Sequence, residues 1–137
     1  MTETKYGKYL VPLPIIPMVG EGNGSEGWDL FGKDMEGFDL QVAMRCFKET
    51  GRMNPELQKR PHAHPFDEVL FFLSTDTNDM TRLGVEAEMR IGAEEEKHII
   101  TVPTAVVVPK GLPHCPITFL KVDNPCYFGH IALSATR

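Results

Sequence analysis

Clusters of glycine, proline, asparagine and aspartate divide this chain into short β-prone runs, and no segment carries a long helical period. The runs lie at 38–46, 68–73, 83–91, 98–102, 105–108, 117–122 and 127–133. With the remaining short segments they make about eight strands, separated by turns every 8–12 residues, which is typical of an all-β sandwich or barrel. We therefore predict a single eight-stranded, or slightly larger, jelly-roll β-barrel with almost no helix.

The first 27 residues differ in texture from the rest and are predicted to form an irregular arm. Three prolines between Leu10 and Pro17 exclude this stretch from a central strand, because proline cannot donate to the strand ladder. We expect the arm to cross a surface in extended form, covering an open sheet edge or docking on a partner subunit. Residues 28–137 are then predicted to form one domain, which is the number of domains expected for a chain of 137 residues.

Charge and composition make some classes of partner and some cellular compartments less favoured. A net charge of −5 without a basic stripe disfavours a nucleic-acid partner, since phosphate backbones demand clustered lysine and arginine. No apolar run approaches the roughly 20 residues that span a bilayer, so no membrane partner is expected. The three cysteines form no paired spacing and are interpreted as reduced, which favours a cytoplasmic protein.

The segment 60–69 carries the strongest chemical signal. His62 and His64 are two residues apart, so in extended chain their imidazoles point to the same side. Pro65 interrupts the ladder and favours a bend, after which Glu68 opens the next strand and can return a carboxylate to the same place.

A second histidine-bearing turn lies downstream at 108–114. Pro109 fixes one backbone angle, Gly111 allows a positive φ, and Pro113 stiffens the exit toward His114. The turn is therefore expected to be tight and rigid, and it delivers His114 in a defined direction.

These two motifs, H-x-H-x-x-x-E followed by P-x-G-x-x-H, resemble the paired motifs of the cupin superfamily. The resemblance covers about residues 38–134 and implies a jelly roll that binds one divalent transition metal through His62, His64, Glu68 and His114. Imidazole and carboxylate ligands without thiolate suit Fe, Mn, Ni, Cu or Zn. Four protein ligands on an octahedral ion leave two positions open for substrate or water, which is a catalytic arrangement.

Other residues are candidates for the pocket. In the family the late strand bearing His130 can line the cavity, so His130 is a candidate second-shell or acid–base residue, with a hydrogen-bonded core histidine as the alternative. Phe72 and Phe119 are predicted to wall the pocket. Arg45 and Arg60 could bind a substrate carboxylate, or else lie in solvent. Cys115 directly follows a ligand and is expected to point to the opposite face, as packing.

The resemblance implies three functional hypotheses. The first is a metal-dependent enzyme, with a dioxygenase-like oxidoreductase favoured and an isomerase, decarboxylase or lyase as alternatives, acting on a small carboxylated or oxygenated molecule. The second is a non-catalytic cupin that binds a small ligand or metal as a sensor. The third is a fold with a purely structural metal. Because cupins commonly pair through their sheets, we also expect a homodimer.

Overall fold

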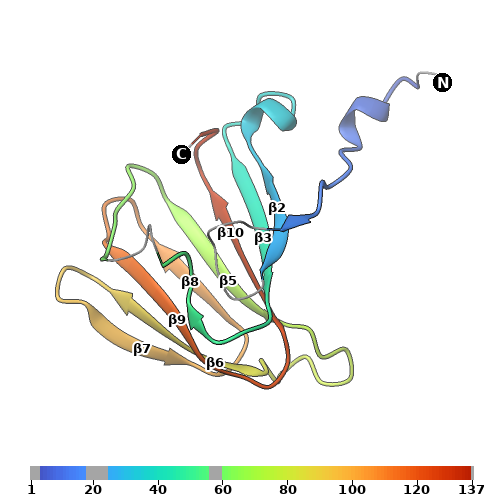
Figure 1. The fold of residues 1–137 in the computed structure, drawn as a ribbon. Helices are drawn as coiled ribbons and strands as arrows, with labels where there is room; N and C mark the ends of the chain where they lie inside the picture. Colours follow the sequence, from blue (N-terminus) through green and yellow to red (C-terminus); the bar gives the residue numbers. More distant parts are fainter. Residues whose placement is uncertain (1–3, 18–24, 56–59, 137) are drawn as a thin grey trace.

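Ten strands pair into two antiparallel sheets in the part of the chain that the computed structural model describes, residues 4–17, 25–55 and 60–136 (Figure 1). The larger sheet has the order β1–β2–β3–β10–β5–β8 and the smaller one the order β4–β9–β6–β7. The strands are β1 Ile16–Pro17, β2 Glu26–Leu30, β3 Gln41–Phe47, β4 Gly51–Arg52, β5 Glu68–Ser74, β6 Val85–Ile91, β7 Glu96–Ile100, β8 Thr104–Val108, β9 His114–Val122 and β10 Cys126–Ala132. Two short 3-10 turns, η1 Gly7–Tyr9 and η2 Gly32–Asp34, are the helical elements described. The all-β jelly-roll prediction is confirmed.

Aromatic side chains join the two sheets into one hydrophobic core. Phe47 of β3 stacks on Phe119 of β9, with ring centroids 4.8 Å apart. Phe128 of β10 meets Phe47 and Phe72 edge-on, at 6.3 and 5.0 Å. Offset-stacked and edge-to-face pairs at such separations add about 0.5–1.5 kcal/mol each beyond the area they bury. The Phe47–Phe119 stack joins the larger sheet to the smaller one, and the two Phe128 contacts lie within the larger sheet.

The inward face of β3 is mixed, because polar residues share it with the apolar Ala43 and Phe47. Gln41 and Arg45 are buried and face the inside, whereas Val42, Met44 and Cys46 face outward and are half-buried. Polar residues can face the interior here because the space between the sheets includes a cavity with polar lining. Val42 and Met44 therefore lie on the outer surface of the larger sheet, while Ala43 and Phe47 stay in the core.

The proline-rich segment meets the body of the protein at a sheet edge. β1 pairs with β2, and Ile16 lies opposite Gly27, so the segment extends the larger sheet as its outermost strand. This edge position agrees with the exclusion of prolines from central strands. β2 begins at Glu26 and was not anticipated from the sequence; residues 1–3 and 18–24 of the predicted arm lie outside the described residues. Residues 4–15 extend away from the sheets (Figure 1).

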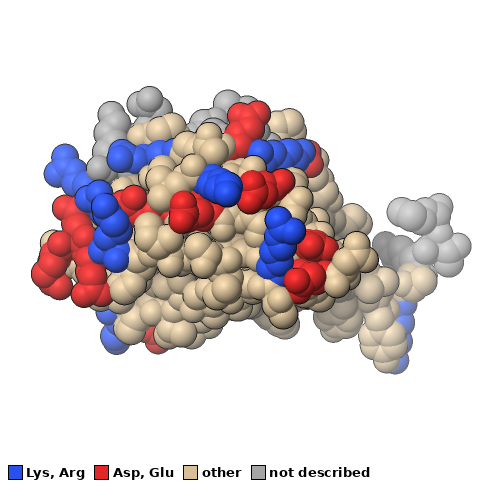
Figure 2. All heavy atoms as spheres, turned by 90° about the horizontal axis from the view of Figure 1, so that it is seen from below, with Lys and Arg blue, Asp and Glu red and all other residues tan. Residues whose placement is uncertain are grey.

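Charged side chains of both signs are interleaved over the face of the molecule drawn in Figure 2, and a broad part of that face carries none. No helix among the described residues is long and apolar enough to cross a membrane.

Candidate metal centre

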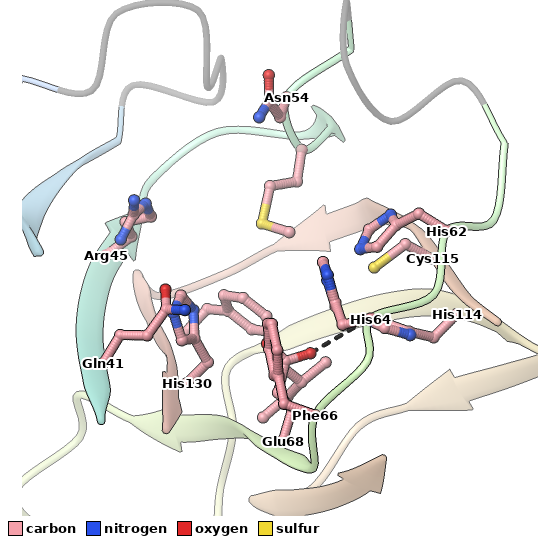
Figure 3. Close-up of a pocket in the computed structure, with 13 residues that line it drawn as sticks. Gln41, Arg45, Asn54, His62, His64, Phe66, Glu68, His114, Cys115 and His130 are labelled. Carbon is pink, nitrogen blue, oxygen red and sulfur yellow. Dashed lines mark ion pairs between the residues drawn. The ribbon is translucent and has the colours of Figure 1, made fainter. Parts of the chain in front are cut away.

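Three histidines from two separate loops converge at one end of the cavity (Figure 3). One ligand nitrogen from each of His62, His64 and His114 lies within 4.8 Å of the others. Two nitrogens bound to one ion at about 2.1 Å are at most about 4.2 Å apart. The cluster therefore needs only a small movement of the side chains to close on a single ion.

Main-chain hydrogen bonds tie the two histidine-bearing loops together. The N–H of His62 donates to the carbonyl of His114 at 3.0 Å, and the N–H of His114 donates back at 2.9 Å. The N–H of Gly111 donates to the carbonyl of His64 at 2.8 Å. Gly111 has a φ of +82°, as expected for the tight turn that its position predicts. The positions of the three imidazoles are thus fixed by the backbone as well as by side-chain packing.

Two neighbours orient individual imidazoles. The His114 Nδ1 lies 2.9 Å from the carbonyl of Leu112, and because a carbonyl can only accept, Nδ1 must carry a proton. In the neutral ring, Nε2 then presents its lone pair to the cluster. The ring of Phe66 stacks on His64 at 4.9 Å with an interplanar angle of 10°. Such outer partners normally fix the tautomer and direction of a ligating histidine.

Glu68 completes the cluster from the first residue of β5. Its Oε1 lies 3.1 Å from the Nε2 of His114, and both side chains are buried. With Nδ1 protonated, a neutral His114 would point a lone pair at a carboxylate oxygen. That contact is stable only when a cation serves both atoms, either a proton on Nε2 or a metal ion. The arrangement of these two donor atoms therefore suits a bound cation.

The electrostatic environment keeps these groups in their ligating forms. Burial, followed by the neighbouring His114 and His64, lowers the pKa of His62 to about 4. Burial by itself would raise the pKa of Glu68, but the hydrogen bond from His114 and the charges of His130, His114 and His64 outweigh it and hold that pKa below its usual value. Near neutral pH, His62 is thus a neutral imidazole and Glu68 a carboxylate, the forms that bind metal.

The cluster forms one end of a cavity of about 290 Å³ between the sheets. Arg45, Gln41 and His130 lie across the cavity from the three imidazoles (Figure 3). Apolar side chains contribute much of the rest of the wall; they are Met53, Phe66, Leu70 and Phe128. The cavity therefore has a metal-binding end, an apolar wall and a polar end.

Several predicted pocket residues lie elsewhere. Phe72 and Phe119 are fully buried in the core and are not among the residues that line the cavity. Arg60 is exposed and also does not line it. Arg45 and His130 do line it. The guanidinium of Arg45 is paired with Asp29 of β2, at 2.9 and 3.0 Å to the two carboxylate oxygens.

Cys115 lines the cavity, contrary to the expectation that it points to the opposite face. Strand alternation fails at this point because Cys115 has a φ of +73° and the pairing of β9 with β6 shifts register nearby, between Met89 and Ile91. Figure 3 shows Cys115 among the side chains that line the pocket. Gln41, Asn54 and Met53 were also missed, and the inward polar face of β3 is the signal that could have found Gln41.

Comparison with solved structures identifies the architecture. An RmlC-like cupin from Shewanella frigidimarina superposes with a TM-score of 0.51 and 15% sequence identity. The match covers 91% of this chain and 86% of the Shewanella protein. The chain has a cupin fold. A recombinant oxalate oxidase in complex with glycolate (TM-score 0.56, 17% identity) and FeII HppE (0.55, 19%) each match 88% of this chain. The chain spans 57% and 56% of their lengths. At these identities the likeness establishes the fold alone. No protein-family model and no curated protein matches the chain.

The cupin fold places the two loops of the histidine cluster at one end of a two-sheet sandwich, and the donor set fits the metal that the fold family implies. Three imidazoles and one carboxylate, without a thiolate, are ligands for first-row transition metals. In the metal-free protein, burial raises the pKa of the Cys115 thiol to about 12, and the charge of Glu68 adds to the effect, so the sulfur carries its proton.

Proposed function

We propose that this cupin is a mononuclear metal enzyme that acts on a small carboxylated or oxygenated molecule, with His62, His64, Glu68 and His114 as the metal ligands. The single observation that carries the proposal is the convergence of three imidazoles and a buried carboxylate on one wall of a 290 Å³ cavity. A purely structural ion would have no need of an adjoining cavity.

A bound divalent ion would supply a Lewis acid or redox centre next to the cavity. The protein's own residues would orient and enclose the ligand. Leu70, Phe128 and Met53 present apolar surface that excludes water from the space between the sheets. Arg45 and Gln41, at the polar end, can orient a substrate oxygen through hydrogen bonds.

His130 is the candidate acid–base residue of this proposal. It lies on β10 opposite Ala43 and Leu70, lines the cavity, and its charge lowers the pKa of Glu68. An imidazole in this position can move a proton between ligand and solvent. A His130→Gln variant should keep its metal, lose turnover by about 100-fold and lose the corresponding limb of the pH–rate profile. Unchanged turnover would remove His130 from the mechanism.

Within the enzyme class we favour a dioxygenase-like oxidoreductase, and an isomerase, decarboxylase or lyase is the alternative. An oxygen electrode separates them, because the first consumes O₂ with substrate and the others turn over without it. Protein loaded in turn with Fe(II), Mn(II), Ni(II), Cu(II) and Zn(II) should be screened against small hydroxy and oxo acids. Ligand binding without turnover by any loaded form would favour the sensor alternative.

We also propose that the protein is a homodimer, formed by the outer face of the larger sheet. The outward side chains of four adjacent strands are apolar; they are Val42, Met44, Val69, Phe71, Leu73, Tyr127, Ile131 and Val107. Val107 is 70% exposed. The arm adds exposed Tyr9, Leu10 and Ile15, and it leaves the body at the edge of this same sheet. A two-fold partner would cover both surfaces at once.

The oligomeric proposal predicts a dimeric mass in sedimentation experiments at micromolar concentration. Val107→Glu, on the outer face, should yield monomers, whereas Ile99→Glu, at a similarly exposed position on β7 of the other sheet, should not. A monomeric wild-type protein would contradict the proposal. We propose in addition one domain at 28–137 preceded by the arm 1–27, and, from the three free cysteines, a cytoplasmic location.

A further inference from the structure

An ion pair between Arg45 and Asp29 stands at the polar end of the cavity. Arg45 lies on β3 opposite Gly27 of β2, and Asp29 is the next inward residue of β2. One guanidinium nitrogen of Arg45 lies 2.9 and 3.0 Å from the two carboxylate oxygens of Asp29. The Arg45 side chain is 8% exposed and lines the cavity, whereas the Asp29 side chain is 25% exposed and is not among the lining residues.

The charged side chains at the cavity are few. Histidines aside, Arg45 and Glu68 are the ionisable residues among the described lining residues that carry a charge near neutral pH. Asp29 cancels the charge of Arg45. A divalent ion in the histidine cluster would bring two positive charges, of which Glu68 offsets one. With the histidines counted as neutral, one net positive charge then remains for a ligand to neutralise.

We propose that Asp29 is a specificity-determining residue that makes this cavity selective for monoanions over dianions. The inference rests on the proposed metal site and names the substrate class for it: a small acid with one carboxylate at the metal and an uncharged remainder. A second carboxylate would have to leave water for an apolar wall and a guanidinium that already has its counter-charge. The ligand's uncharged part would instead contact Leu70, Phe128 and Met53.

Two acids of equal chain length test the proposal. 2-Hydroxybutyrate and malate share the same hydroxy-carboxylate head and differ at the far end, which is a methyl group in one and a carboxylate in the other. Both should be titrated calorimetrically into Zn(II)-loaded protein, and the ratio of their dissociation constants is the readout. The wild type should bind 2-hydroxybutyrate more tightly.

Asp29→Asn removes the counter-charge and should shift this ratio toward malate by about ten-fold, because the guanidinium then offers its charge to the far carboxylate of malate. The double variant Asp29→Asn/Arg45→Gln removes both charges and should return the ratio to the wild-type value. Glu26→Gln, which breaks the exposed Glu26–Lys48 pair on the same strand, is the matched control and should leave the ratio unchanged.

Failure of the inference and failure of the metal site give different results. If Zn(II) does not bind, the proposed function falls. If Zn(II) binds but neither acid does, or malate binds the wild type more tightly, or Asp29→Asn leaves the ratio where it was, the inference is overturned while the metal site stands. A double variant that keeps the ratio of the single Asp29→Asn variant also overturns it, because the effect would then not act through Arg45.

Discussion

The main chains of His62 and His114 form a reciprocal pair of hydrogen bonds, at 3.0 and 2.9 Å, although the two residues are 52 positions apart. The backbone conformation of each histidine-bearing loop is therefore held in part by the other loop. A disturbance in one loop should reach the ligands on both, even where it leaves the rest of the sandwich intact.

Gly111→Ala tests this dependence. Gly111 has a φ of +82° with nothing within 4 Å of an added Cβ, so the substitution introduces backbone strain without a clash. We expect a loss of about 1 kcal/mol in the free energy of unfolding. Metal affinity should fall as well, by about ten-fold, because the turn positions His114. Isothermal titration and urea unfolding measure the two effects.

Gly37→Ala is the matched control for that variant. Gly37 has a φ of +80°, also faces open space, and lies in the turn after η2, outside the residues that line the cavity. It should lose a similar amount of stability and keep wild-type metal affinity. Equal losses of affinity in the two variants would mean that the turn has no special role in the site.

The pH dependence of the metal-free protein should report on His62. Because the folded-state pKa of about 4 lies below the ordinary value of 6.5, the unfolded chain binds more protons between these values. Stability from this group is complete above pH 6.5 and is lost as the pH falls toward 4. His62→Gln should flatten the decline in urea unfolding measured at pH 7, 6 and 5. The same decline of stability with pH in His62→Gln and the wild type would contradict a lowered pKa at His62.

Phe66→Leu should weaken metal binding without destabilising the fold. The stacked ring holds the imidazole of His64 at 4.9 Å, and Phe66 is only partly buried, so its loss removes orientation more than core packing. We expect affinity to fall a few-fold and the midpoint of urea unfolding to change little. Phe38→Leu, at an exposed aromatic position outside the cavity lining, is the control. Wild-type affinity in Phe66→Leu would show that the stacking is incidental.

Cys115 should not be a metal ligand, although it lines the cavity. Burial raises the pKa of its thiol to about 12, so it carries its proton at neutral pH. Co(II)-loaded protein should lack a thiolate charge-transfer band, and Cys115→Ser should bind Co(II) within about three-fold of the wild type. A band present in the wild type and absent from Cys115→Ser would place sulfur in the ligand set.

Sequence reasoning located the histidine cluster because two of its signals are local. The spacing of His62 and His64 and the turn around Gly111 are written in contiguous residues, and each constrains its own backbone. It failed where the decisive relation is between distant strands. The pairing of Arg45 with Asp29 needs the register of β3 against β2, a strand that the sequence did not reveal.

The remaining differences from the predictions concern which side chains reach the cavity. Cys115 was assigned to the wrong face because a positive φ and a register shift interrupt β9 beside His114. Phe72 and Phe119 are predicted to wall the cavity, but both are fully buried in the core, and Leu70 of β5 and Phe128 of β10 line it instead. Whether a buried side chain reaches the cavity depends on how the two sheets pack together, and no single run of residues determines that packing.

Metal titration tests the central claim most directly. Purified protein, stripped and then titrated with Mn(II), Fe(II) or Zn(II), should bind one ion per chain. His62→Ala, His64→Ala, His114→Ala and Glu68→Gln should each weaken binding by at least ten-fold, while His98→Ala, an exposed histidine on β7, should match the wild type. Absence of stoichiometric binding, or equal affinity in the Glu68→Gln and wild-type proteins, would contradict the four-residue metal centre.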